Sequence, residues 1–400
     1  MTGMHRLSAL TSRQRLLNAM LHKPVDHVPL LLRFWSLGGE TDNIPFDWRD
    51  EVKRVEATTA LGLDDTLLLQ PPLGYVEDYI VERAHGVRSF IELLPVEAAG
   101  SYPLLKKVYT TPDGPLQTVI QLSEDWPRGN DIRLFDDFNI SRLKEPLIKD
   151  SADLLRLRHL LPDPTKEQLA EFSQRAALLH SEAQRLGVVL DGGWMALGDA
   201  AMWLCGMQRI LYGQMDEPDF IEQVLDTIQA WELKRLDLLL EADIDVLVHM
   251  AWYESTDFWS PRTYRKLIRP RLQVVIDRCH ARGVKFRYII TRSWKAYRQD
   301  FIDMGIDCLT GVDPVQDKLD MGEVKGEIGG QLCLMGGLNS AVMLSLWSDD
   351  EIRGAVRQAI DCLAHDGGFI LYPVDAVFNT QPWENVKVLI DEWKALEKIA

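Results

Sequence analysis

Short runs of apolar residues, each ending in polar residues, recur along this chain. In one run, β-branched and leucine side chains lead to His249, and a polar, aromatic segment continues to Glu254 before a helix start at Ser260–Pro261. Continuous apolar runs of this length are typical of strands buried in a parallel sheet. The polar residue that ends each strand is then expected at the edge of that sheet.

Eight such runs alternate with helix-like segments. Eight strands alternating with helices over this length predict a (β/α)8 TIM barrel, in the α/β class. A doubly wound open sheet is the rival fold, but no G-x-G-x-x-G pattern follows the first run. The expected strands are residues 27–35, 65–70, 187–191, 244–249, 285–291, 307–312, 331–335 and 368–372.

The alternation breaks between residues 74 and 139. There, Leu104–Thr111 and Leu116–Leu122 flank the turn Pro112–Pro115, a pattern that predicts a β-hairpin. We therefore expect one domain, residues 1–400, with an insertion at about 74–139 after the second strand. Two helices, at 144–161 and 165–186, are expected to follow it.

Composition narrows the class of protein. The chain has 400 residues, 46% hydrophobic and 26% charged, with a formal net charge of −16. That charge repels phosphates, so neither nucleic acid nor a membrane surface is expected as a partner, while an anionic small substrate remains compatible with a basic pocket. Five scattered cysteines without a C-x-x-C pair, together with the lack of an apolar leader or membrane-length run, predict a cytoplasmic protein.

Barrel enzymes work at the carboxyl ends of their strands, and that rule selects the candidate site. Each residue also has a structural interpretation, as a turn cap or an ion-pair partner, so their shared position is the stronger signal. The candidate catalytic residues are His249, Glu254, Asp313 and Asp375. The candidate substrate-binding residues are Arg33, Trp35, Gln70, Asp191, Trp252, Tyr253, Tyr288, Arg292 and Asn339.

Metal-ligand and nucleophile motifs are weak in this sequence. H-E-x-x-H and G-x-S-x-G are both missing, and a metal-free site is expected, with His249 and the carboxylates moving protons or anchoring substrate. The glycines of Asp191–Gly193 either let a ligand approach the backbone or make a turn.

Several segments together resemble the uroporphyrinogen decarboxylase superfamily, whose members share a (β/α)8 barrel. The resemblance runs nearly end to end and is weakest over 74–139. The segments that carry it are Thr11–Met20 with Lys23–Pro29, Phe258–Pro261 with Ile268–Pro270, Gly305–Asp307, Gly336–Asn339, Gly367–Ile370 and Gln381–Asn385.

Departures from the family pattern shape the expected activity. The decarboxylases carry an R-Q-A-G-R loop after the first strand, whereas this chain has one arginine, Arg33, in that segment. Cobamide-dependent methyltransferases that act on thiols bind zinc at positions that fall here on Ile289, Thr291 and Asp375. What remains resembles the decarboxylase-like branch that includes corrinoid-linked O-demethylating methyltransferases.

The resemblance thus implies an enzyme, a methyltransferase or O-demethylase acting on a small, methoxylated aromatic compound. A corrinoid carried by a partner protein would be its cofactor, and a homodimer is one assembly that it allows. Trp35, Trp252, Tyr253 and Tyr288 would hold a flat ligand, and His249 or Glu254 would protonate the leaving oxygen. The alternatives are a carboxy-lyase acting on a carboxylated pyrrole or aromatic acid, with Arg33 and Arg292 holding carboxylates, and a non-catalytic binding protein.

Overall fold

A curled parallel sheet forms the centre of the molecule. The computed structural model describes residues 9–37, 40–72, 87–95 and 101–397. Seven parallel strands are hydrogen-bonded in the order β12-β11-β10-β9-β8-β7-β2. They are β2 (Thr66–Leu69), β7 (Val189–Ala196), β8 (Val246–Met250), β9 (Lys285–Ile289), β10 (Cys308–Val312), β11 (Cys333–Asn339) and β12 (Phe369–Val374).

The first predicted strand lies between the two edges of this sheet. Leu30 forms a parallel bridge with Leu371 in β12, and Leu31 forms one with Asp64, just before β2. Beyond these bridges, β1 (Phe34–Trp35) pairs with β13 (Val377–Phe378) instead of β2. The arrangement is an α/β fold of the TIM-barrel type, and β1 and β2 separate toward their carboxyl ends.

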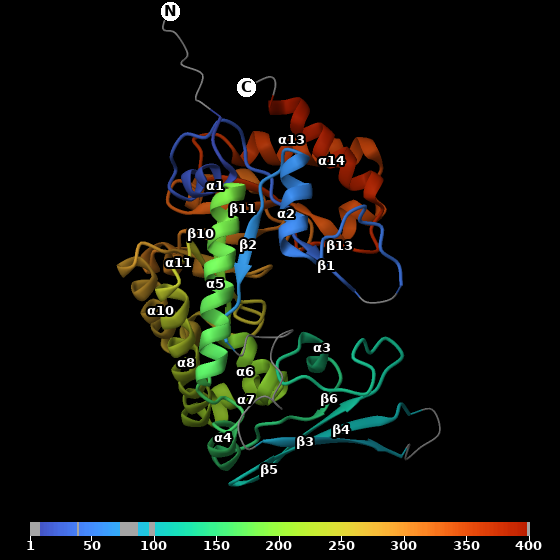
Figure 1. Cartoon of the computed structure of the whole chain (residues 1–400), viewed down its shortest axis with the longest axis vertical. Coiled ribbons are helices and arrows are strands. Elements are labelled where there is room, and N and C mark those ends of the chain that lie inside the picture. The colour runs from blue at the N-terminus through green and yellow to red at the C-terminus, as the bar shows by residue number, and fades with distance from the viewer. Residues whose placement is uncertain (1–8, 38–39, 73–86, 96–100, 398–400) are drawn as a thin grey trace, which may run out of the picture.

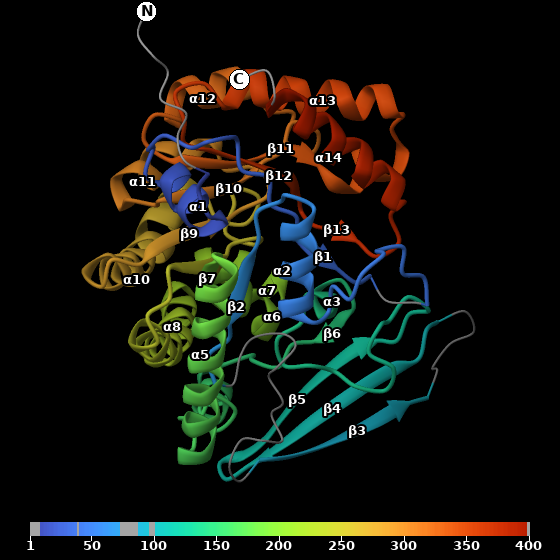
Figure 2. The same ribbon diagram turned by 45° about the horizontal axis from the view of Figure 1, so that its top comes forward.

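Helices follow the strands and cover the outside of the sheet (Figures 1 and 2). Thr11 caps α1 with a capping box, and α5 packs on β2 as α13 does on β11. None of the helices in the described ranges is long and apolar enough to cross a membrane. The helices are α1 (Ser12–Met20), α2 (Glu51–Ala60), α5 (Lys166–Leu186), α6 (Gly198–Cys205), α7 (Met207–Asp216), α8 (Pro218–Glu241), α9 (Pro261–Thr263) running through η2 (Tyr264–Ile268) into α10 (Arg269–Ala281), η3 (Lys295–Tyr297) before α11 (Arg298–Met304), α12 (Met321–Ile328), η4 (Ser340–Leu344), α13 (Asp349–Leu363) and α14 (Trp383–Glu397).

A smaller antiparallel sheet lies at the lower end of the view in Figure 1. Its strands, in order, are β3 (Arg88–Leu94), β4 (Leu104–Thr111), β5 (Gly114–Gln121) and β6 (Leu143–Glu145). The stretch for which the sequence predicts a hairpin forms β4 and β5, which pair in antiparallel register. Residues 74–86 and 96–100 of the expected insertion lie outside the described part of the chain.

The predicted start of the next helix was wrong. A helix was expected over residues 144–161, but Glu145 pairs with Val119 as part of β6. The helix starts at Ser151, where the Asp150 carboxylate accepts hydrogen bonds from two backbone N–H groups, and α4 ends at Leu157. Pro146 has no N–H group to donate within a helix, so the strand-to-helix switch falls after it. A short helix, α3 (Asp137–Ile140), precedes β6.

Candidate active site

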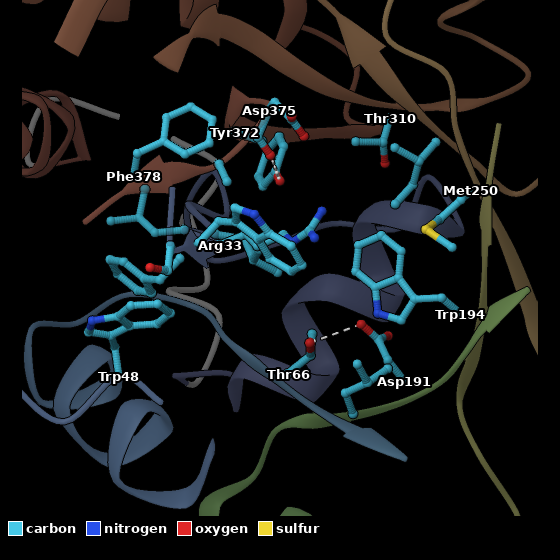
Figure 3. A pocket seen from close by; sticks show the side chains of 18 of the residues that line it. Arg33, Trp48, Thr66, Asp191, Trp194, Met250, Thr310, Tyr372, Asp375 and Phe378 are labelled. Carbon is cyan, nitrogen blue, oxygen red and sulfur yellow. Dashed lines mark hydrogen bonds between the residues drawn. The ribbon is translucent and has the colours of Figure 1, made fainter. Parts of the chain in front are cut away.

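A cavity of about 800 Å³ lies inside the curled sheet, toward the carboxyl ends of the strands (Figure 3). Barrel interiors are ordinarily filled by layers of apolar side chains. Here the inward-facing residues are partly polar, which leaves room for a ligand of small-molecule size. Six of them, each from a different strand of the main sheet, are Thr66, Asp191, Arg287, Thr310, Met335 and Tyr372.

Arg33 projects into the middle of this cavity (Figure 3). Its guanidinium carbon lies 4.0 Å from the centre of the Trp194 ring and 5.0 Å from that of Trp35. Arginine on tryptophan is a favourable cation–π arrangement that fixes the direction of the guanidinium. No carboxylate among the described residues forms an ion pair with Arg33. Its positive charge is therefore available to an anionic group of a ligand.

A buried ion pair forms another part of the cavity wall. The Asp191 Oδ2 atom lies 3.1 Å from Arg287 Nη2 and accepts a hydrogen bond of 2.9 Å from the Thr66 hydroxyl. Asp191 is 2% exposed and Arg287 is 8% exposed. Burial raises the pKa of Asp191, and the neighbouring Arg287 charge opposes that rise. The pair comes from β7 and β9, on either side of β8.

Several buried polar atoms of the lining have no hydrogen-bond partner within the described part of the chain. Buried polar atoms are nearly always paired, so a group of unpaired ones in one cavity needs an explanation, such as a bound polar ligand or ordered water. Their types are mixed, with three acceptors and two donors. The atoms are Glu51 Oε2, Gln70 Oε1, Asp191 Oδ1, Trp252 Nε1 and Arg287 Nε.

Asp375 supplies a second carboxyl group to the cavity. It follows β12, and its backbone carbonyl accepts a hydrogen bond from the Tyr372 hydroxyl. Burial raises the pKa of the Asp375 carboxyl, while the charge of Arg33 lowers it. A carboxyl group with a raised pKa is better suited to donate a proton than an ordinary surface aspartate.

Three of the residues predicted from sequence meet outside the cavity. His249 Nε2 lies 3.1 Å from Glu254 Oε1, which also accepts a 2.7 Å hydrogen bond from the Gly198 N–H. The Tyr288 hydroxyl donates to Glu254 Oε2 over 2.5 Å, and its ring stacks on His249. His249 alternates with Met250, which lines the cavity, so it projects from the opposite face of β8. This trio, called here the His249 network, faces the helix layer.

Asp199, which the sequence analysis missed, holds the loop that follows β8. Its carboxylate accepts hydrogen bonds from the backbone N–H groups of Trp252 and Tyr253. Burial, followed by the nearby charge of Glu254, raises the pKa of Asp199 well above its ordinary value. The Trp252 ring reaches the cavity, whereas Tyr253 contributes through its hydroxyl, which donates to the lining residue Asp137 over 2.7 Å.

The remaining three predicted residues make structural contacts away from the cavity. Asp313 accepts hydrogen bonds from two backbone N–H groups of the turn after β10 and another from the Asn339 side chain. Asn339 also caps η4 through Val342. Arg292 is exposed and pairs with Asp257 over 2.9 Å. The predicted residues that do line the cavity are Arg33, Trp35, Gln70, Asp191, Trp252 and Asp375.

Arg287 and Trp194 line the cavity but were not found from the sequence. A usable signal for Arg287 is its charge between the aromatic residues Phe286 and Tyr288 of a buried strand, since burying a charge is costly without a purpose. The glycines before Trp194 are explained by packing. A Cβ at Gly192 would lie 2.4 Å from the Ile244 side chain, and one at Gly193, where φ is +133°, would lie 2.7 Å from the Val248 carbonyl.

The three positions that correspond to zinc ligands of thiol methyltransferases do meet in this cavity. Ile289, Thr291 and Asp375 all line it. Zinc in proteins is held by thiolate, imidazole and carboxylate groups, and of these three side chains only Asp375 offers one. The residues present therefore do not fit that zinc site.

Comparison with known proteins places the chain among relatives. The family model for uroporphyrinogen decarboxylase (URO-D) matches residues 129–396. Two curated relatives, both methylcobamide:CoM methyltransferase MtaA from Methanosarcina barkeri, the second from strain Fusaro / DSM 804, are 26% identical over 213 and 215 residues. Each match covers 52% of this chain and 59% of the relative, so the chain spans only about three fifths of their length.

A solved structure shares the fold over nearly the whole chain. It is a methyltransferase from Methanosarcina mazei, 19% identical, and the match covers 97% of this chain and 99% of that one with a TM-score of 0.57. The shared fold includes the strands that build the cavity.

Proposed function

Because the chain belongs to the uroporphyrinogen decarboxylase (URO-D) family, we propose that it is a methyltransferase of that family. It would move a methyl group between a small compound in the cavity and a corrinoid carried by a partner protein. The observation that carries the proposal is the cavity itself, with aromatic walls and, as far as the described residues go, an arginine without a carboxylate partner and unpaired buried polar atoms. The two relatives named methylcobamide:CoM methyltransferases support the reaction type.

The proposed substrate is a methoxylated aromatic compound that carries an acidic group. Trp48, Trp252 and Phe378 line the cavity and offer flat apolar surface, while Arg33 offers a positive charge. A cavity of about 800 Å³ suits a ligand of this size. A corrinoid is far larger than such a compound, so it would reach the substrate from the cavity opening.

A bound corrinoid supplies the nucleophile that takes the methyl group from an ether. The chain itself must assist the departing oxygen, which gains negative charge as its bond to the methyl carbon breaks and needs a proton. Asp375 is the proposed proton donor, because it lines the cavity and burial raises its pKa. The tryptophan walls keep water away, and Arg33 fixes the substrate's orientation.

The His249 network takes a supporting role in this scheme. His249 and Glu254 were predicted as proton donors, but both side chains lie outside the cavity lining. Through Glu254 and Gly198 they link the start of α6 to β8, and Asp199 in α6 holds the backbone of Trp252. They are therefore positioning residues for the cavity wall.

Decarboxylation of an aromatic or pyrrole acid is the second candidate. It is favoured because no carboxylate of the described residues pairs with Arg33, which would hold a substrate carboxylate. Arg292, the other arginine expected to do so, pairs with Asp257 outside the cavity. A multiply carboxylated pyrrole would need further arginines. Most of those in the lining, such as Arg287, already pair with aspartates, whereas Arg175 forms no ion pair within the described residues.

The test measures transfer of the methyl group to a corrinoid. The purified protein is incubated with reduced cobalamin and a series of methoxylated benzoates, and the corrinoid absorption spectrum and the phenolic product are measured together. Stoichiometric formation of methylcobalamin and phenol, lost in Asp375→Asn, is the expected result. A parallel incubation with uroporphyrinogen, without cobalamin, detects decarboxylation. Release of carbon dioxide there, with no methyl transfer, would replace the first proposal by the second.

A further inference from the structure

The Asp191–Arg287 pair has one unpaired hydrogen-bonding atom on each partner. Asp191 Oδ2 is used by Arg287 Nη2 and by the Thr66 hydroxyl, as the dashed line in Figure 3 shows for Thr66. Asp191 Oδ1 and Arg287 Nε remain buried, and no described residue hydrogen-bonds to either atom. Each is two bonds away from an atom of the 3.1 Å contact. One acceptor and one donor are thus left beside the same ion pair.

The charges of Asp191 and Arg287 determine which kind of ligand group can hydrogen-bond to both unpaired atoms. A substrate carboxylate would be repelled by the negative charge of Asp191. The nearby charges of Asp65 and Asp245 already act on Asp191 and raise its pKa. An ammonium group would meet the positive charge of Arg287. Two like charges at short range in a buried site repel strongly, whereas an uncharged group avoids this cost.

We infer that the Asp191–Arg287 pair is a specificity site for an uncharged substrate group that donates one hydrogen bond and accepts another, of which a hydroxyl is the simplest. The group donates to Asp191 Oδ1 and accepts from Arg287 Nε–H. This deepens the proposed function, on which it rests for the cavity being a substrate site. Within that cavity, Arg33 takes an acidic group and the ion pair recognises a neutral one.

Binding of two small probes, measured by ¹⁹F NMR titration, tests this assignment. 4-Fluorophenol can donate and accept at the pair, whereas 4-fluoroanisole can only accept and leaves Asp191 Oδ1 unpaired. A hydrogen bond to a charged partner corresponds to about a tenfold to hundredfold preference for the phenol. 4-Fluorobenzoate is the third probe. Because Arg33 takes its acidic group, its affinity should not fall in the Asp191→Asn variant.

Asp191→Asn is the decisive variant. Its remaining oxygen accepts from Thr66 and Arg287 as Oδ2 does now, which puts an NH₂ group in the place of Oδ1. A donor there should abolish or reverse the preference for the phenol. Thr310→Val is the matched control. It removes a hydroxyl from the same cavity, but that hydroxyl already contacts the Met335 sulfur, so the preference should stay.

The outcomes separate this inference from the proposed function. Equal binding of phenol and anisole to the natural protein, or no binding of the phenol, would overturn it and leave ordered water as the partner of the pair. A preference that survives in Asp191→Asn would do the same. If that variant does not fold, the natural protein's preference still decides. These titrations need neither a corrinoid nor methyl transfer, so failure of methyl transfer in its own assay is a distinct result.

Discussion

The His249 network and the cavity lining are two groups of buried polar side chains on opposite faces of the same strands. In the network, each carboxylate oxygen of Glu254 accepts at least one hydrogen bond, and a single buried atom, His249 Nδ1, has no partner among the described residues. In the lining, five buried atoms have no hydrogen-bond partner in the ranges that the structure describes. Satisfied buried groups hold a structure together, whereas unsatisfied ones at a cavity are available to a ligand. The difference assigns stability to the first group and binding to the second.

The sharpest way to break this distinction is Glu254→Ala. It leaves the Tyr288 hydroxyl, the Gly198 N–H and His249 buried without their common acceptor. Losing one member of such a network should lower the free energy of unfolding by about 3–5 kcal/mol, as measured in urea. Glu254→Gln keeps an acceptor and should lose less. A change below about 1 kcal/mol for the alanine variant would show that the network is not structural.

Asp375→Asn tests the cavity side of the comparison. Removal of the proposed proton donor should slow methyl transfer from an ether about a hundredfold or more. The free energy of unfolding should change by about 1 kcal/mol or less, because no hydrogen bond to this carboxylate is formed by the described residues.

Asp313→Asn is the matched control for that variant. Asp313 is a second buried aspartate at a strand end, but it accepts backbone hydrogen bonds in a turn. Its substitution should weaken stability and leave the rate nearly unchanged. The reverse pattern, with activity lost in Asp313→Asn and kept in Asp375→Asn, would exchange the roles of the two residues.

Much of this arrangement was predictable from hydrophobic pattern alone. The seven apolar runs from residue 65 onward coincide with parallel strands of the main sheet, because buried parallel strands require continuous apolar sequence. Residues 27–35 form two isolated bridges and the short strand β1 in place of one continuous strand. After the bridges the segment pairs with β13 and not with β2, and the cavity opens there. Glu145 was assigned to a helix because its partner Val119 is 26 positions away in the sequence, beyond any local signal.

The choice of site residues was less predictable, and β9 shows why. Tyr288 was chosen for its aromatic ring and Arg287 was passed over. Side chains alternate across a strand, so the two point to opposite faces, and only Arg287 reaches the cavity. The register of β9 decides which of its two faces points into the cavity, and that register is set by its pairing with the neighbouring strands. Asp375 directly follows the end of β12, where the sequence rule works without register, and Arg33 lies between the Leu31 bridge and β1.

Arg33→Lys sharpens the picture of the binding side. Lysine keeps the charge but loses the planar group that lies on Trp194 and Trp35. The KM for a methoxylated benzoate should rise about tenfold with little change in kcat, since the substrate loses a preorganised contact. Arg292→Lys, at the other arginine predicted to hold carboxylates, should leave the KM unchanged. Equal effects in both variants would contradict the assignment of Arg33.

The smallest expected effect is a pH dependence of stability that arises in the His249 network. Burial lowers the pKa of His249, but the charge and hydrogen bond of Glu254 together with the charges of Glu232 and Asp199 outweigh it, and the net shift is upward. A histidine whose pKa is raised in the folded state stabilises that state fully below the unfolded pKa of about 6.5. This contribution is lost as the pH rises through the folded pKa.

Unfolding free energies measured in urea between pH 6 and pH 9 should therefore decline for the natural protein. His249→Gln places an amide near Glu254, where it can still donate a hydrogen bond without titrating. Its stability should be lower at pH 6 and change less with pH, so that the two curves converge toward pH 9. Parallel curves would mean that His249 is neutral throughout, and the network would then be held by hydrogen bonds without a charge on the imidazole.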